Sequence, residues 1–267
     1  MVFGTGNKNL LIFGNLILFV LILTTCTGTS GIDAKAKPIL TISAASNLIP
    51  AFEEIGARFE DETGIEAEFN FGASAQLTQQ IIQGAPVDIF ASADAVYIDA
   101  LLDEELLVES SATDFARGRI VLWTAKGSDL ELHEIRDLNG LSVETVALAN
   151  PAYAPFGKAA REALETVGVW EELADKIIYG SSVSQTLHMA ELGSADAAIV
   201  ALSLVLDSDG DWTLIPERQH EPIRQVLVIL RGTENVGASR TFIEYVRGET
   251  GQEILRRFGF EVPEVKP

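Results

Sequence analysis

Two serines in this chain stand at the same place in two similar local patterns. Ser46 ends the run ILTISAAS at residues 39–46, and Ser74 ends the run IEAEFNFGAS at residues 65–74. In both runs a strand-like stretch stops at small residues and a helical pattern follows, so each serine is predicted to be a helix N-cap. The start of a helix offers unpaired backbone N–H groups and about half a positive charge. Two such helix starts side by side would form a site for an anion.

The same residues do not form a recognisable enzyme site. The segment GASAQ at residues 72–76 lacks the second glycine of a hydrolase nucleophile elbow. His133, His188 and His220 show neither the H-E-x-x-H pattern nor another paired metal spacing. The sequence therefore predicts a binding protein that is not an enzyme and that needs no cofactor.

Strand-like and helical stretches alternate almost without interruption. Strands are predicted at residues 39–44, 65–71, 87–91, 119–125, 145–149, 176–179, 196–201, 212–215 and 225–231. Helices are predicted at residues 48–61, 75–83, 94–107, 157–167, 184–192, 238–247 and 249–258. Such alternation is typical of an α/β fold, in which helices cover mostly parallel sheets. No long linker divides the chain, so two domains would be joined by strands that cross near residues 117–119 and 222–224.

The N-terminal segment has the features of an export signal. No charged residue lies between Lys8 and Asp33, and residues 10–23 are nearly all apolar. This stretch is short for a membrane span, which needs about 20 apolar residues. The only cysteine, Cys26, follows at once and resembles the lipidated cysteine of a bacterial lipoprotein, although Thr25 departs from the usual small residue before it. The alternative is ordinary cleavage after residues 34–36.

Residues 1–25 are accordingly predicted to be a signal peptide, with a tether at residues 26–38. The protein is expected to be exported to the periplasm or cell surface, with a lipid anchor at Cys26. With one cysteine in the chain, no internal disulfide can form. Stability must therefore come from the core.

The chain is strongly acidic, with 39 Asp and Glu against 19 Lys and Arg. This balance argues against a nucleic-acid partner, because phosphate backbones are bound by Lys and Arg. It does not exclude a small anion. Hydrogen bonds to a charged group contribute roughly 1.5–3 kcal/mol each, so five or more neutral donors suffice for micromolar to nanomolar binding. Net charge then governs solubility, and local dipoles govern affinity.

Four motifs, taken in order, resemble those of molybdate-binding proteins that serve ABC transporters. They are SAASNL at residues 43–48, FGAS at 71–74, GAPVDIFASAD at 84–94 and ANPAYAPFG at 149–157. The resemblance implies a two-lobed type II periplasmic binding protein fold, with a mixed, mostly parallel sheet in each lobe and two crossing strands between them. Lobe 1 is then expected at residues 39–118 and 225–263, and lobe 2 at residues 119–224.

The resemblance also implies a set of ligand-binding residues for the oxyanion. Ser46 and Ser74 would supply hydroxyl and backbone N–H groups from the first lobe. Phe156 and Val183 would each donate a backbone N–H from the second lobe. Asn47 directly follows the first serine, as in some members of the family, and is predicted to be a further donor.

The chain departs from the family pattern, and each assignment has an alternative. Some members have a tyrosine donor where this chain has Ala201. A single helix-opening serine is more often a plain cap than a ligand donor, and Asn47 would then bond only its own turn. Asp88 and Asp94 are expected to be structural, since a carboxylate repels an anion. Two tyrosines, Tyr153 and Tyr179, are expected to lie at the surface or in the core.

The expected function is the capture of molybdate or tungstate between the lobes and its delivery to an ABC permease by a monomeric receptor. Both ions are bare dianions near neutral pH, whereas monohydrogen phosphate carries a proton that a donor-only site leaves unpaired, at a cost of roughly 1–3 kcal/mol. Sulfate must be rejected by size. The alternatives are a binding protein for another oxyanion such as sulfate, and a ligand-sensing surface lipoprotein without a transport role.

Overall fold

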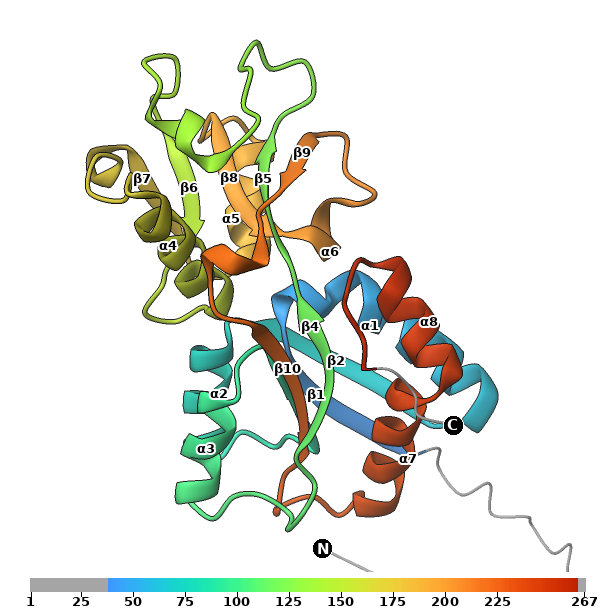
Figure 1. The fold of residues 1–267 in the computed structure, drawn as a ribbon. Coiled ribbons are helices and arrows are strands. Elements are labelled where there is room, and N and C mark those ends of the chain that lie inside the picture. The colour runs from blue at the N-terminus through green and yellow to red at the C-terminus, as the bar shows by residue number, and fades with distance from the viewer. Residues whose placement is uncertain (1–37, 264–267) are drawn as a thin grey trace, which may run out of the picture. The chain divides into compact units, whose positions relative to one another are not determined.

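The computed structural model describes residues 38–263 of the 267-residue chain. The predicted signal peptide at residues 1–25, Cys26 and all but the last residue of the predicted tether lie outside the described residues. The described residues form two five-stranded mixed sheets, and each sheet is the centre of one lobe (Figure 1).

The sheet of lobe 1 has the strand order β2-β1-β3-β10-β4. Its strands are β1 (Ile39–Ala45), β2 (Glu66–Gly72), β3 (Ile89–Ser92), β4 (Thr113–Gly118) and β10 (Ile223–Ile229). Strand β1 is parallel to β2 and β3, whereas β10 is antiparallel to β3 and β4. Because β1, β3 and β10 occupy the middle of the sheet, their residues are almost all buried.

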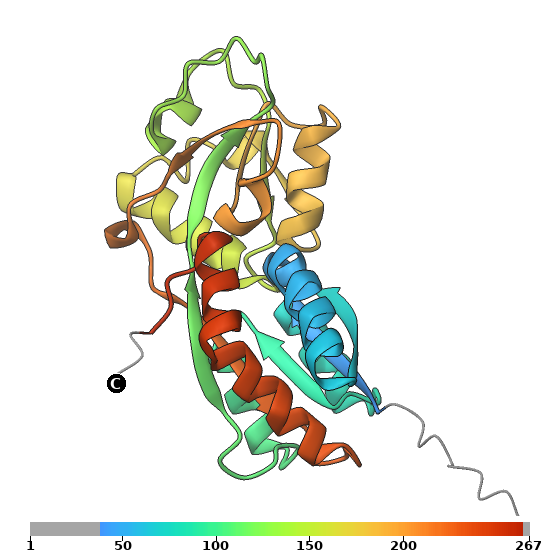
Figure 2. The same ribbon diagram turned by 90° about the vertical axis from the view of Figure 1, so that its right-hand side faces the viewer.

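Five helices cover the two faces of this sheet. They are α1 (Ile49–Thr63), α2 (Ser74–Ile82), α3 (Val96–Asp103), α7 (Val236–Arg247) and α8 (Glu249–Arg257). Helices α1, α7 and α8 pack together on one face, and α2 and α3 pack on the other (Figures 1 and 2). Helix α1 buries Ala51, Phe52, Ile55 and Phe59, a spacing that places them along one side of the helix.

The sheet of lobe 2 has the order β7-β6-β8-β5-β9. Its strands are β5 (Ile120–Thr124), β6 (Val146–Ala149), β7 (Ile177–Gly180), β8 (Ala197–Ala201) and β9 (Asp211–Leu214). Strand β6 is parallel to β7 and β8, and β5 is antiparallel to β8 and β9. The helices of this lobe are α4 (Pro155–Val167), α5 (Val183–Glu191) and the short α6 (Leu202–Val205).

The chain crosses between the lobes at two places. Only Arg119 separates β4 of lobe 1 from β5 of lobe 2, and residues 215–222 lead from β9 back to β10. Strands β4 and β10 are neighbours, with Ile223 opposite Gly118, so the two crossings lie side by side. The predicted fold class, two α/β lobes of mixed sheet joined by crossing strands, is confirmed.

Strand β4 is the one sheet strand of the described residues that the sequence pattern missed. It carries only two adjacent apolar residues, Phe115 and Ala116, between charged neighbours, and it lies at the edge of the sheet. Backbone pairing to β10 and to Glu261 holds it there. Its strand character therefore depends on tertiary contacts more than on local propensity.

Candidate functional site

Ser46 lies at the end of β1, where the 3-10 helix η1 (Ser46–Leu48) begins. The prediction that Ser46 is an N-cap is wrong. The cap position belongs to Ala45, which has the extended backbone that a cap requires, and Ser46 makes no capping hydrogen bond to its own helix. Its Oγ instead accepts a hydrogen bond from the backbone N–H of Ser184 in lobe 2, with a distance of 3.4 Å.

Ser74 is placed like Ser46, between a strand and a helix, at the end of the neighbouring strand β2. It is the first residue of α2, the cap position belongs to Ala73, and the predicted N-cap is again wrong. The fully buried Oγ of Ser74 accepts a hydrogen bond from the backbone N–H of Ala93, at 3.1 Å. A hydroxyl whose oxygen accepts one hydrogen bond keeps its own hydrogen as a donor. Both serines are therefore arranged to donate to an acceptor-only ligand such as an oxyanion.

The helix of lobe 2 that faces Ser46 has a genuine cap. Ser182 has an extended backbone, and its Oγ accepts the backbone N–H of Gln185 at 3.3 Å. Val183 and Ser184 are consequently the first two residues of α5, whose backbone N–H groups have no partner within the helix. The start of α5 faces η1 of lobe 1, because the backbone N–H of Ser184 donates a hydrogen bond to Oγ of Ser46. The sequence signal for this cap is a serine three residues before a glutamine, in SVSQ at residues 182–185.

The start of α2 faces lobe 2 in the same manner. The backbone N–H of Ala75, the second residue of α2, donates to the carbonyl of Tyr153 at 3.2 Å. The side chain of Tyr153 itself is half exposed, as is that of Tyr179. The starts of α2 and α5 therefore both lie at the boundary between the lobes, and their dipoles favour negative charge there.

Phe156 is the second residue of α4, directly after Pro155, which suits a first helical turn. Gly157 allows this helix start to lie against the end of β6, because a Cβ on Gly157 would be 2.0 Å from the carbonyl oxygen of Ala149. The ring of Phe156 is 2% exposed and packs on the first crossing strand. A Cβ on Gly118 would lie 2.7 Å from its Cζ atom.

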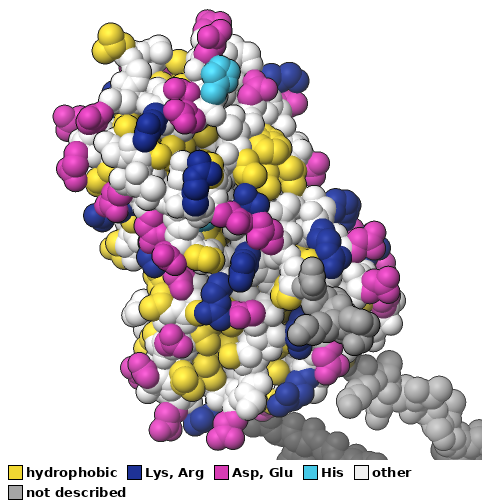
Figure 3. All heavy atoms as spheres, in the orientation of Figure 1, with side chains coloured by type: hydrophobic (Ala, Val, Ile, Leu, Met, Phe, Trp, Pro, Cys, Tyr) yellow, Lys and Arg dark blue, Asp and Glu magenta, His cyan; other side chains and the backbone are white. Residues whose placement is uncertain are grey.

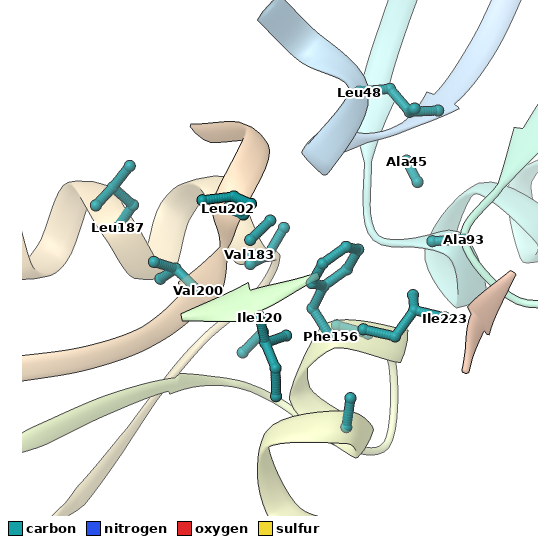
Figure 4. Close-up of a cluster of buried hydrophobic side chains, with 14 of the residues drawn as sticks. Ala45, Leu48, Ala93, Ile120, Phe156, Val183, Leu187, Val200, Leu202 and Ile223 are labelled. Atoms are coloured by element: carbon teal, nitrogen blue, oxygen red, sulfur yellow. The ribbon is translucent and has the colours of Figure 1, made fainter. Parts of the chain in front are cut away.

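Small apolar residues of lobe 1 meet Phe156 and Val183 at the lobe boundary. Figure 4 shows Ala45 and Ala93 on the lobe 1 side of this boundary, with Phe156 and Val183 opposite them. All four belong to one continuous core cluster. Because alanine has no side chain beyond Cβ, the boundary brings the two lobes' backbones close to each other.

Asn47 is fully buried beside Ser46. Its Nδ2 donates to Oε1 of Gln225 at 3.1 Å, and its backbone carbonyl accepts the hydroxyl of Ser203 in lobe 2 at 2.7 Å. Its Oδ1 is buried and has no hydrogen-bond partner among the described residues. Asn47 therefore does more than bond its own turn. Sequence reasoning missed Gln225, whose signal was one amide within the apolar run IRQVLVI.

The lobes are closed around these residues. The five predicted ligand residues, Ser46, Asn47, Ser74, Phe156 and Val183, are between 0% and 4% exposed. Near them Lys158 of α4 approaches Asp94 of lobe 1, with Nζ and Oδ2 3.9 Å apart. These five residues are therefore closed off from solvent in this structure.

The carboxylates of the third motif have structural partners. Asp88 accepts hydrogen bonds from the backbone of Thr41 and from the side chains of Thr233 and Asn235. Asp94 accepts the backbone N–H of Val96 in addition to its approach to Lys158. These contacts agree with the structural role that the sequence predicts for both residues.

Neither a metal-ion cluster nor a membrane-spanning helix occurs among the described residues. Within residues 38–263, no group of three or more His, Cys, Asp or Glu is placed to hold a metal ion. In the same part of the chain, no helix combines the length and apolarity that a membrane span needs. On the face drawn in Figure 3, Lys and Arg side chains are scattered among Asp and Glu.

Comparisons with known proteins match nearly the whole described chain. A family model for bacterial extracellular solute-binding proteins matches residues 40–261. The chain is 33% identical over 231 residues to the molybdate-binding protein ModA of Rhodobacter capsulatus, covering 86% of this chain and 90% of that protein. It is 31% identical over 249 residues to the putative ABC transporter substrate-binding lipoprotein YvgL of Bacillus subtilis, covering 92% and 95%.

A solved structure gives the same result for the fold. The periplasmic molybdate-binding protein of Azotobacter vinelandii superposes with a TM-score of 0.81 at 28% sequence identity, and the match covers 84% of this chain and 100% of that one.

Proposed function

Because the chain belongs to the family of bacterial extracellular solute-binding proteins, we propose that it captures molybdate or tungstate between its lobes and delivers the ion to an ABC permease. One observation carries this proposal. Two serine hydroxyls of lobe 1 have their oxygens occupied by backbone N–H groups, and the starts of α2 and α5 lie at the same boundary. The site is thus rich in neutral donors, and its relatives are named as molybdate-binding proteins.

Ligand binding and lobe closure are one process in this proposal. Ser46 and Ser74 belong to lobe 1, whereas the backbone N–H groups of Phe156 and Val183 belong to lobe 2. Only the closed state gives the ion donors from both lobes, and this differential affinity is what a conformational shift requires. The permease would then recognise the closed form.

Selection among oxyanions is proposed to follow from the kind of groups that face the ligand. A protonated oxyanion such as monohydrogen phosphate needs an acceptor for its proton, and the proposed ligand groups are serine hydroxyls, the Asn47 amide hydrogen and backbone N–H groups, with no carboxylate among them. Leaving that proton unpaired costs roughly 1–3 kcal/mol. Molybdate and tungstate carry no proton near neutral pH, so they avoid this cost.

Asn47 is proposed to replace the tyrosine that some family members place where this chain has Ala201. Ala201 is fully buried at the end of β8 and has no polar side-chain atom. The second hydrogen of the Asn47 amide is a donor on the lobe 1 side of the boundary. Phe156 is proposed to contribute only its backbone N–H, because its ring packs on Gly118.

We further propose that the protein is an exported monomer, a receptor without catalytic activity, attached to the membrane by a lipid on Cys26. The signal-like sequence before Cys26 and the lipoprotein name of the Bacillus subtilis relative support this proposal. Cys26→Ala should release the protein from the membrane fraction of cells. Retention of the variant in that fraction would rule out the anchor. The lobes are proposed to comprise residues 39–118 with 225–263, and residues 119–224.

Thermal unfolding with added oxyanions tests the function. A ligand that binds only the folded state at 100 times its Kd stabilises that state by about 2.7 kcal/mol. Molybdate and tungstate should therefore raise Tm by several degrees, whereas equal concentrations of phosphate should not. An unchanged Tm with every oxyanion would exclude the proposed function.

A further inference from the structure

We infer that Gln225 is a positioning residue for the oxyanion site, and that it orients the Asn47 amide from the second crossing strand. The inference rests on the proposed function, because it names a residue that tunes the same site. Gln225 is fully buried in β10, where its neighbours Val226, Leu227 and Val228 are apolar. Burying a polar side chain is unfavourable unless it is hydrogen-bonded, so its partners indicate its role.

A directed chain of hydrogen bonds runs from the strand backbone to Asn47. Gln225 Nε2 donates to the carbonyl of Ile223 at 3.3 Å, and Gln225 Oε1 accepts from Asn47 Nδ2 at 3.1 Å. An amide nitrogen donates and an amide oxygen accepts. The carbonyl of Ile223 therefore fixes the orientation of Gln225, and Gln225 in turn fixes that of Asn47. One hydrogen of Asn47 Nδ2 is used, and the other is left for the ligand.

Asn47 is not placed here for stability alone. Its Oδ1 is buried without a hydrogen-bond partner among residues 38–263, which disfavours folding. Its carbonyl is bound by Ser203 of lobe 2, so its backbone is held from both lobes. An unprotonated anion has no hydrogen to donate to Oδ1. The unpaired Oδ1 is instead the cost of turning Nδ2 toward Gln225, which leaves the second Nδ2 hydrogen for the anion.

Gln225 also touches the residues that must move when the lobes open. Its neighbour Ile223 lies opposite Gly118 in the pairing of the two crossing strands. A Cβ on Gly118 would lie 3.2 Å from Gln225 Nε2 and 2.7 Å from Phe156 Cζ. Figure 4 shows Ile223 and Phe156 next to each other at this junction. A change in the crossing strands therefore reaches Gln225, and through it the amide of Asn47.

Affinity measurements on paired variants test this role. Gln225→Leu keeps the volume and removes both hydrogen bonds, and it should weaken molybdate binding roughly tenfold. Asn47→Ala should weaken molybdate binding by a similar factor. The double variant should bind molybdate about as well as the single variant that binds it less tightly, because both substitutions disrupt the same hydrogen-bonded pair. Additive losses would overturn the inference.

Gln252→Leu is a matched control. Gln252 is equally buried, and its Nε2 donates to the carbonyls of Phe115 and Val246 in lobe 1. Its replacement should lower Tm and leave the affinity of the folded protein unchanged. If Gln225→Leu behaves like Gln252→Leu, Gln225 is merely structural and the inference fails.

A pH profile supplies a second readout, which also serves if Gln225→Leu does not fold. Gln225→Glu keeps an acceptor for Asn47 and adds a carboxyl whose pKa is raised by burial. Its molybdate affinity should fall as pH rises through the pKa of that carboxyl, while that of the wild-type protein stays flat. A flat profile for the variant would contradict the inference. Absence of oxyanion binding by the wild-type protein would instead reject the proposed function.

Discussion

The side-chain oxygen of Ser46 lies 3.4 Å from the backbone nitrogen of Ser184, and this bond joins the end of a lobe 1 strand to the start of a lobe 2 helix. It occupies the oxygen of the serine and leaves the hydroxyl hydrogen as a donor. The same use of a serine oxygen recurs at Ser74, whose partner is the N–H of Ala93. We propose that these two bonds, and not helix caps, make the boundary between the lobes suitable for an oxyanion.

Replacing Ser74 with alanine should weaken molybdate binding by about 1–3 kcal/mol, because one hydrogen bond to a charged ligand is lost. The variant should also be about 1 kcal/mol less stable, since the buried N–H of Ala93 loses its partner. Calorimetric titration and urea unfolding measure the two effects. Ser111→Ala is the control, because Ser111 is buried and its Oγ accepts the N–H of Ile229 within lobe 1. Ser111→Ala should lower the stability of the protein and leave its molybdate affinity unchanged. An unchanged affinity in Ser74→Ala would remove Ser74 from the ligand set.

Gly157→Ala should disturb the helix start that carries the N–H of Phe156. The added methyl group would lie 2.0 Å from the carbonyl oxygen of Ala149, so α4 must shift away from β6. Such overpacking typically lowers stability by about 1–3 kcal/mol, and affinity should fall with it. Gly237→Ala in α7 is the matched control, since no atom lies within 4 Å of its added Cβ. Equal affinities of the two variants would show that the position of the α4 start does not matter for binding.

The ion pair of Lys158 and Asp94 should favour the closed state. The pair joins the two lobes at 3.9 Å and is partly exposed, so its contribution should not exceed about 1 kcal/mol. Lys158→Ala and Asp94→Asn should both weaken binding, less so at high salt. Arg161→Ala, which breaks an ion pair within α4, should leave affinity unchanged. Tighter molybdate binding by Asp94→Asn would mean that Asp94 acts by repelling the anion and that the ion pair does not stabilise the closed state.

The carboxyl of Glu261 should make stability depend on pH. A hydrogen bond between the two carboxyls raises the pKa of Glu261 and lowers that of Glu217; burial also raises the pKa of Glu261, while nearby Arg119 opposes this. A raised pKa in the folded state contributes stability at acidic pH, and this contribution is lost as pH rises through that pKa. Glu261→Gln should therefore match the wild-type stability in acid and exceed it at neutral pH. Urea unfolding of both proteins between pH 4 and 8 measures the difference. A difference that is constant with pH would contradict this account.

Local sequence patterns predicted most of the fold because most of its elements carry a clear local signal. The strand around Leu148 is a continuous apolar run, and Gly168 ends α4 with a positive φ that favours glycine. Strand β4 was missed because it has only two adjacent apolar residues, Phe115 and Ala116, between charged neighbours. The predicted caps were wrong by one residue, since only the backbone shows that Ala45 and Ala73 have the extended conformation.

The candidate site was predicted as a set of residues, but its internal bonding was not. The motifs indicate which residues meet at the lobe boundary, because each motif follows a strand or opens a helix. No pattern links Asn47 to Gln225, which are 178 positions apart. The role of a buried amide side chain depends on which groups its oxygen and its nitrogen contact, and these contacts are known only once the folded backbone is known.

Equilibrium titration of the purified, ligand-free protein tests the central claim most directly. Molybdate, tungstate, sulfate and phosphate should each be added at neutral pH, and binding followed by calorimetry. The account predicts micromolar or tighter binding of molybdate and tungstate, roughly 8 kcal/mol or more, with sulfate and phosphate at least tenfold weaker. Preferential binding of sulfate or phosphate would contradict it.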